Sequence, residues 1–411
     1  MVHALSFNMR LLAHHELGGF GGIGEGMALQ QSRDGRRILW LAHEAAPKNF
    51  TGVDVSDPRA PRVIVQTDLP HAKLRSNSLD VTGDVMAVAC QTATVGLKPA
   101  GFDLFDVSSP AQPKRISHFD ASGPHSRGAH QLWFVDGEFV HLSSGAADFQ
   151  PRHPEDDQIY RIVDVRDPAR PVEAGRWWLP GTREGDSEPA PARLHKGIRP
   201  EDLFSTGFRA HNTNVFPQRP DRAYVGYIDG GAVILDIADK ARPKVVGRWN
   251  HSPPFNGFTH TVLPLFGREL LIVSDECVRD GGADWPRLVW VVDARNERNP
   301  VPISTFPAPP VDAFVRRGGR FGAHNLHENQ PGPTSFRSET IIVGTFFNAG
   351  VRAYDLANPY QPQEIAYYVP EAPKLSRAGA IQLNDVYVDE NRIVYTVDRH
   401  AGGLYILEMT V

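Results

Sequence analysis

One phrase recurs along the chain: an apolar run ending in Asp, a short turn that usually contains proline, and a second apolar run. The repeated aspartates are 52 to 72 positions apart and are Asp54, Asp106, Asp164, Asp236, Asp293 and Asp355. Asp accepts backbone N–H bonds in tight turns, whereas Pro fixes φ and blocks further strand pairing. We therefore interpret these aspartates as structural, and their spacing predicts a repeat architecture.

Each repeat unit contains four short runs rich in Val, Ile, Tyr and Phe, with no sustained helical period between them. The runs of the fourth unit are 211–216, 222–228, 231–236 and 243–249. Dividing 411 residues by seven gives about 59 per unit, which suits a propeller blade with its loops. The sequence therefore predicts an all-β, seven-bladed β-propeller with four antiparallel strands per blade.

We expect a single propeller domain over residues 1–411. Its approximate blades are 26–70, 71–124, 125–180, 205–252, 256–308, 320–370 and 380–411. The last unit lacks a fourth run, whereas residues 5–16 contain one with no unit before it. We expect this N-terminal strand to complete the last blade, because closure removes two open sheet edges. Residues 181–209 form a long loop that we place on the active-site face, either as a lid or as a surface excursion.

The strand ending in Asp and the Asp-Pro-x-x-Pro turn resemble the LVIVD-repeat proteins, which form β-propellers. The phrases Ala-Val-Ile-Leu-Asp-Ile at 232–237 and Ile-Tyr-Arg-Ile-Val-Asp-Val at 159–165 carry the match. The resemblance covers nearly the whole chain. It implies a fold but no activity, because the family is defined by its repeat.

Composition excludes several classes of protein. A net charge of −5 gives no field that attracts nucleic acid or an anionic membrane. Two cysteines are too few for a disulfide framework or a cysteine metal cluster. No run approaches the ~18 apolar residues of a membrane span, and the N-terminus lacks the pattern of a secretory signal. We expect a cytoplasmic protein that binds neither nucleic acid nor membrane; its oligomeric state stays open.

A second pattern appears where the first strands of the units are aligned. The third residue is histidine in four consecutive units, at His130, His211, His260 and His324. First strands line the channel of a propeller, so these imidazoles should lie at one height around its axis. Neutral imidazole is a common ligand of transition metals, and four buried rings without a cation would be costly. The pattern predicts one divalent metal, with iron preferred and copper, manganese or zinc as alternatives. Four unrelated histidines in a wet channel are the structural alternative.

Carboxylate residues follow the second strand of several units, and we expect them to lie on the same face of the propeller as the four histidines. We predict that Glu44, Asp229, Asp275 and Asp398 accept the remaining ring N–H groups of the ligands. Asp229 also suits a simple turn. His43, His400 and Glu276 are predicted acid/base groups. Phe149, Phe204 and Phe208, from two long loops, are predicted to form an apolar wall for a small organic substrate.

The carotenoid-cleavage oxygenases are similar in architecture alone: a seven-bladed propeller with an axial iron held by four histidines. That similarity implies dioxygen chemistry. We therefore predict a metal-dependent oxidoreductase or oxygenase that acts on a small organic substrate. A metal-dependent (manganese or zinc) lyase or hydrolase at the same site and a non-catalytic interaction scaffold are the alternatives. The sequence does not name the substrate.

Overall fold

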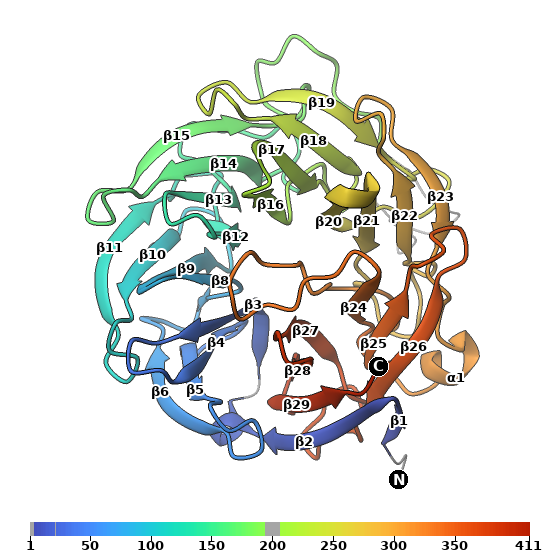
Figure 1. Ribbon diagram of the computed structural model, residues 1–411. Coiled ribbons are helices and arrows are strands. Elements are labelled where there is room, and N and C mark those ends of the chain that lie inside the picture. The colour runs from blue at the N-terminus through green and yellow to red at the C-terminus, as the bar shows by residue number, and fades with distance from the viewer. Residues whose placement is uncertain (1–3, 21, 194–205) are drawn as a thin grey trace.

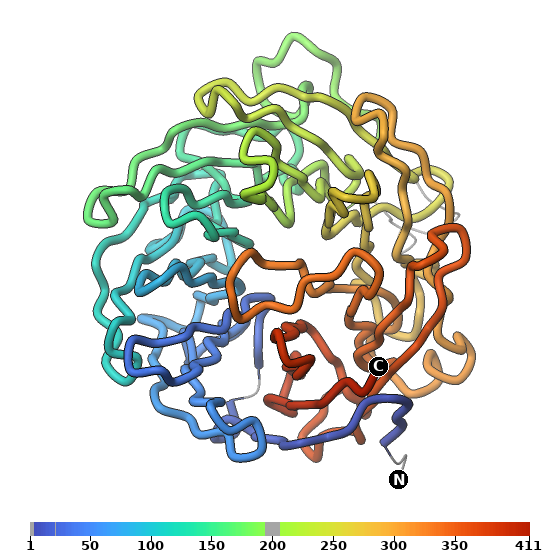
Figure 2. The backbone as a smooth tube through the Cα atoms, viewed as in Figure 1, coloured from blue at the N-terminus to red at the C-terminus, as the bar shows by residue number. Residues whose placement is uncertain are grey.

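The strands of the described residues form seven antiparallel sheets around a central channel (Figure 1). The structure is a computed structural model that describes residues 4–20, 22–193 and 206–411. The chain passes once around the ring, so that blue and red segments meet at the bottom of Figure 2. These features confirm the seven-bladed, all-β propeller predicted from the repeat.

The first three blades follow the chain order. Blade one consists of β3 (Ile23–Gln31), β4 (Arg37–His43), β5 (Lys48–Asp54) and β6 (Arg62–Asp68). Blade two consists of β7 (Leu74–Arg75), β8 (Leu79–Thr82), β9 (Val85–Thr92), β10 (Gly101–Asp106) and β11 (Lys114–Asp120), so its innermost strand is split in two. Blade three consists of β12 (Ala129–Trp133), β13 (Phe139–Ser144), β14 (Ile159–Asp164) and β15 (Val172–Trp177).

The next two blades have the same order, and the strands of blade four lie close to the runs predicted for the fourth unit. Blade four consists of β16 (Thr213–Phe216), β17 (Arg219–Gly226), β18 (Ala232–Asp236) and β19 (Lys244–Trp249). Blade five consists of β20 (Thr259–Leu265), β21 (Leu270–Asp275), β22 (Val289–Asp293) and β23 (Val301–Thr305). The second strand of blade four closely approaches the innermost strand of blade five: a Cβ at Gly226 in β17 would lie 1.9 Å from the carbonyl oxygen of His260 in β20.

The last two blades are completed by the N-terminal segment. Blade six contains β24 (Ile341–Thr345), β25 (Val351–Asp355) and β26 (Gln363–Val369), and blade seven contains β27 (Leu383–Val388), β28 (Ile393–Asp398) and β29 (Leu404–Met409). Strand β2 (Met9–His15) pairs with β29, which confirms the predicted closure. Strand β1 (Leu5–Phe7) instead pairs with β26, so residues 5–7 join blade six. Asn8, with φ of 50°, turns the chain between the two blades and donates from Nδ2 to the Ile365 carbonyl at 2.9 Å.

The innermost position of blade six holds an irregular segment rather than a named strand. Its pairing is limited to isolated bridges, Phe321 with Phe347 and Leu326 with Gly344. Helical structure among the described residues is short, as in α1 (Val311–Val315), η1 (Leu17–Gly19) and η3 (Phe266–Arg268). None of the helices in these described ranges is long and apolar enough to span a membrane.

The repeated aspartates make the turns that were predicted for them. Each accepts a hydrogen bond from the backbone N–H two residues later, as in Asp106 with Ser108 at 2.9 Å and Asp355 with Ala357 at 2.7 Å. The same contact occurs at Asp54, Asp164, Asp236 and Asp293. These side chains are therefore structural.

One end of the channel is crossed by the segment 327–340, the orange loop over the centre of Figure 1. Oγ1 of Thr334 donates to the carbonyl of Leu29 in blade one at 3.2 Å. The backbone N–H of Phe336 donates to the carbonyl of Val388 in blade seven at 3.0 Å. These bonds hold the segment across the channel.

Candidate metal centre

The imidazoles of His130, His211, His260 and His324 form an arc around the channel, one from each of blades three to six. Adjacent ring centroids are 4.6, 3.9 and 4.7 Å apart. Nε2 of His130 and Nε2 of His211 are separated by 3.0 Å. The structure thus brings the four predicted histidines together at one level of the channel.

Two glutamates complete the cluster. Glu25, from β3, contacts all four rings: its carboxylate oxygens lie 4.0, 3.8, 3.4 and 3.5 Å from Nε2 of His130, His211, His260 and His324. Glu276, which follows β21, lies 3.9 Å from Nε2 of His211 and 3.6 Å from Nε2 of His324. Ligand atoms of Glu25, His211, His260 and Glu276 all lie within 4.8 Å of one another, as required of a group that could hold a metal ion.

The other ring nitrogen of each histidine is already occupied, so Nε2 is directed inward. The Nδ1 contacts are His130 with Gln91 Oε1 at 2.9 Å, His211 with Asn212 Oδ1 at 3.0 Å, His260 with Thr261 Oγ1 at 2.8 Å, and His324 with the Asn384 carbonyl at 2.7 Å. Such contacts fix the tautomer and orientation of metal-binding histidines. All four Nε2 atoms thereby lie within 4.0 Å of the Glu25 carboxylate, whereas the group whose ligand atoms are all within 4.8 Å of one another includes His211 and His260 but neither His130 nor His324.

The donor set fits a cation. Nε2 of His260, Nε2 of His324 and Oε2 of Glu25 are buried and have no hydrogen-bond partner within the described part of the chain. Unpaired buried polar atoms are costly, and a cation between them removes that cost. Nε2 of His130 and Nε2 of His211 contact each other at 3.0 Å and are not among these unpaired atoms.

The charge states also suit metal binding. Burial, together with the neighbouring His260, lowers the pKa of His211 to about 4, so its imidazole is neutral at pH 7. Burial and the neighbouring His211 likewise lower the pKa of His130 well below its usual value. Burial opposes ionisation of Glu25, but the imidazoles of His260 and His324 outweigh it and lower the carboxyl pKa well below its usual value. Neutral imidazoles and an ionised carboxylate are the forms that bind metals.

Two of the histidines lie at irregularities in the pairing of the innermost strands, which direct their side chains toward the channel. The β-sheet register shifts at His130, between Ala129 and Gln131, and at His260, between Thr259 and Thr261. A β-bulge re-aims a side chain, so these two histidines leave the regular alternation of their strands.

Glu25 is not among the residues that the comparison of the repeat units singled out. A Cβ at Gly24 would lie 2.4 Å from the Asn77 carbonyl oxygen, and one at Gly26 would lie 2.1 Å from the backbone nitrogen of Leu79. The two glycines therefore permit β3 to approach blade two, with a register shift that spans Glu25. The isolated acid between two glycines was the signal available in the sequence.

The acids predicted as partners of the imidazoles have other roles, which corrects that prediction. Glu44 pairs with Arg75 at 3.0 Å and with Arg399. The other three bind mainly backbone or indole N–H groups: Asp229 binds Thr206 and Gly207, Asp275 binds Leu288 and Trp290, and Asp398 binds Gln382 and 400–402. The Nδ1 atoms of the four histidines instead contact side-chain amide, hydroxyl and backbone carbonyl oxygens.

Of the three predicted acid/base residues, the structure places Glu276 in the cluster. His43 is buried in blade one with Nε2 2.7 Å from Oγ1 of Thr51, and burial lowers its pKa to about 4. His400 is half-buried, and its backbone N–H donates to Asp398 at 3.0 Å. Neither histidine lines the cavity that opens from the metal centre.

That cavity has a volume of about 260 Å³, and we call it the arginine cavity. Five arginines line it, namely Arg75, Arg127, Arg209, Arg320 and Arg399. The predicted apolar wall is absent from it: Phe149 is buried against Trp178, Phe208 is buried in the core, and Phe204 lies outside the described residues. Of the predicted long loop 181–209, residues 194–205 also lie outside the described residues, and Arg209 lines the cavity.

Three acids line a smaller space of about 30 Å³ that Glu25 also lines: Glu328 and Asp385, which are buried, and Asp80, which is half-buried. Burial raises the pKa of Asp80 and of Glu328 to about 7, and raises that of Asp385 well above its usual value. Oε1 of Glu328 accepts hydrogen bonds from Nδ2 of Asn212 at 2.8 Å and Nδ2 of Asn214 at 2.9 Å. Glu25 therefore separates an arginine-lined space from an acid-lined one.

The raised pKa of Glu328 predicts a pH-dependent gain of stability in Glu328→Gln. Between the usual value of 4.5 and about 7, the unfolded chain loses this proton while the folded chain keeps it, so rising pH favours unfolding of the wild type. The amide avoids this loss and can still accept both Asn bonds. Relative to wild type, the variant should gain on the order of 2–3 kcal/mol between pH 5 and pH 8, measured by denaturant unfolding. Exposed Glu184→Gln is the control, and an equal difference at both pH values would contradict the prediction.

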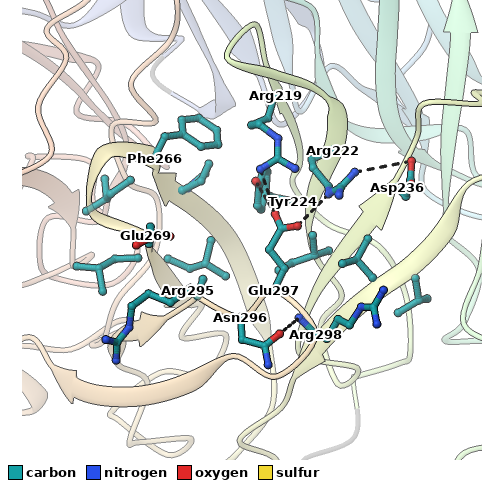
Figure 3. A pocket seen from close by; sticks show the side chains of 18 of the residues that line it. Arg219, Arg222, Tyr224, Asp236, Phe266, Glu269, Arg295, Asn296, Glu297 and Arg298 are labelled. Carbon is teal, nitrogen blue, oxygen red and sulfur yellow. Dashed lines mark hydrogen bonds and ion pairs between the residues drawn. The ribbon is translucent and has the colours of Figure 1, made fainter.

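A larger cavity of about 730 Å³ lies between blades four and five, away from the metal centre (Figure 3). Five cationic side chains and three carboxylates line it, and Glu297 contacts Arg222 at 3.1 Å and Arg219 at 3.6 Å. The group of described residues that could hold a metal ion lies outside this groove, in the channel.

Comparison with known proteins supports the fold. Residues 221–251 match the model of the LVIVD repeat, which confirms that resemblance over this segment. The chain is similar to the β-propeller domain of Cps50 (Swd1) from Myceliophteria thermophila, with 15% identity, a TM-score of 0.54, and coverage of 94% of this chain and 96% of that chain. It is also similar to Sqt1 from Saccharomyces cerevisiae, with 8% identity, a TM-score of 0.56, and coverage of 98% and 99%. At these identities the similarity shows the fold alone, and no curated protein matches the chain.

Proposed function

We propose that the protein is a metal-dependent enzyme of the oxidoreductase or oxygenase type, with one divalent transition metal in its channel. The observation that carries this proposal is the gathering of four imidazole Nε2 atoms within 4.0 Å of the buried Glu25 carboxylate, with Glu276 beside them. Histidine and carboxylate donors suit iron, copper, manganese or zinc, and iron is our first choice. A redox-active ion held there would supply electron transfer to or from a bound substrate.

The protein's own groups would hold the substrate and handle protons. The arginine cavity opens directly on the cluster, since Glu25, His130, His211 and Glu276 line it. Nη1 of Arg320 contacts Oε1 of Glu276 at 2.9 Å. Burial opposes ionisation of Glu276, but the neighbouring His324 outweighs it, and the pKa of Glu276 is lowered. An ionised carboxylate beside the substrate position is suited to accept a proton there.

A metal-dependent lyase or hydrolase is the second candidate. Glu276 favours it, because a carboxylate next to a Lewis-acid metal suffices for proton transfer without redox chemistry. Equal turnover with zinc and with iron would support this candidate, whereas turnover restricted to iron or copper would support the oxidoreductase.

The test is elemental analysis of protein purified without an affinity tag. We expect about one equivalent of a transition metal in the wild type and much less in His211→Ala, because the variant loses a ligand whose second nitrogen is already fixed by Asn212. His71→Ala is the matched control, since His71 is exposed and contacts the Lys98 carbonyl. Equal metal content in wild type and His211→Ala would contradict the site. No metal in any sample would favour the interaction scaffold.

A further inference from the structure

The arginine cavity carries an excess of positive charge. Five arginines line it against three carboxylates, those of Glu25, Glu44 and Glu276. The chain as a whole has a net charge of −5, so the positive charge of the cavity lining is opposite in sign to the net charge of the protein. A cleft of one sign attracts small ions of the other sign.

Ion pairing within the protein accounts for part of this charge. Arg75 and Arg399 pair with Glu44, and Arg320 pairs with Glu276. The remaining two guanidinium groups share the carboxylate of Asp157, with Arg127 at 2.6 Å and Arg209 at 3.2 Å, and Arg209 also lies 4.0 Å from the carboxylate of Glu155. Neither Asp157 nor Glu155 lines the cavity, so the lining itself keeps five cations against three carboxylates, before any metal adds its charge.

Unsatisfied donors line the same cavity. Nε of Arg209 and Nε2 of Gln91 are buried and lack a hydrogen-bond partner among the residues that the structure describes. Gln91 is 1% exposed, and its Oε1 already contacts His130, which fixes the orientation of the amide. Buried donors of this kind need an acceptor, and an oxyanion supplies several.

We infer that the arginine cavity binds a small organic oxyanion as the substrate of the proposed enzyme. A planar guanidinium binds carboxylate or phosphate oxygens in pairs, and Arg209 is the residue with a donor left over. The volume of about 260 Å³ corresponds to roughly nine water molecules at ~30 Å³ each, which suits an acid of a few carbon atoms. The inference rests on the proposed function in assigning the anion as substrate; the binding of the anion stands on the cavity alone.

The experiment is calorimetric titration of the protein with succinate, inorganic phosphate and neutral succinamide, in metal-free and metal-loaded form. We expect at least one of the two anions to bind at least ~10-fold more tightly than succinamide, and its affinity to fall as salt rises. Comparing succinate with phosphate distinguishes a carboxylate from a phosphate ligand. Arg209→Gln and Arg127→Gln should each weaken binding of the preferred anion at least ~10-fold.

Arg222→Gln is the matched control. Its side chain is 17% exposed against 16% for Arg209, and it pairs with Glu297 at 3.1 Å in the groove between blades four and five. Unchanged anion affinity in both cavity variants, or equal affinity for anions and succinamide, would overturn the inference. Metal bound without any anion binding overturns the inference and leaves the proposed function standing. Anion binding to protein that takes up no metal overturns the proposed function and leaves the anion site.

Discussion

Replacing Glu25 by glutamine is expected to lower the affinity for the proposed metal by about 10- to 100-fold. Glu25 is the carboxylate within 4.0 Å of all four imidazole Nε2 atoms, so every ligand loses the same charged neighbour. Its low pKa keeps it ionised at neutral pH, and glutamine retains the shape without the charge. The measurement is a metal titration in competition with a chelator of known affinity.

Glu328→Gln is the matched control for that experiment. Glu328 is also a buried glutamate of the channel, but it binds Asn212 and Asn214 rather than the imidazoles. We expect its metal affinity to stay within about threefold of wild type, well below a factor of ten. A Glu25→Gln protein that binds metal as tightly as wild type would show that the imidazoles suffice and that Glu25 is not a ligand.

Replacing Gly226 by alanine is expected to destabilise the protein by about 3–5 kcal/mol. The added Cβ would lie 1.9 Å from the carbonyl oxygen of His260 and 2.5 Å from its carbonyl carbon, and backbone atoms cannot move aside as a flexible side chain does. Blades four and five would have to separate, which also displaces His211 and His260. The measurement is denaturant unfolding at fixed pH.

Gly332→Ala is the control for this substitution. A Cβ there would have Oγ1 of Thr334, at 3.8 Å, as its nearest neighbour, which is an ordinary contact. We expect a change within about 1 kcal/mol. If Gly226→Ala unfolds at the same denaturant concentration as Gly332→Ala, the close approach of the two blades is not a constraint on the fold.

The fold was predictable because the repeat is local. Each aspartate turn is set by neighbouring residues, and the missing fourth run of the last unit indicated closure by β2. The sequence did not predict that β1 joins blade six, because that pairing depends on a single turn at Asn8. It also did not show that the innermost position of blade six is irregular around His324, where long-range contacts replace a regular ladder.

The candidate site was predictable where equivalent repeat positions carry the same residue type. The four histidines follow that rule, and the structure brings them together. Glu25 breaks it, because it lies within the register shift between Ile23 and Met27 that two glycines permit. The partner acids were misassigned because an Asp at a strand end is as well suited to bind turn N–H groups as ring N–H groups, and Asp229 and Asp398 do the former.

The loop across one end of the channel has a kinetic consequence. Thr334 and Phe336 tie that loop to blades one and seven, and Glu25 divides the space behind it from the arginine cavity. Under the proposed function, substrate would reach the cluster and product would leave it on the arginine-cavity side of Glu25. Released product should then compete directly with incoming substrate for the same cavity.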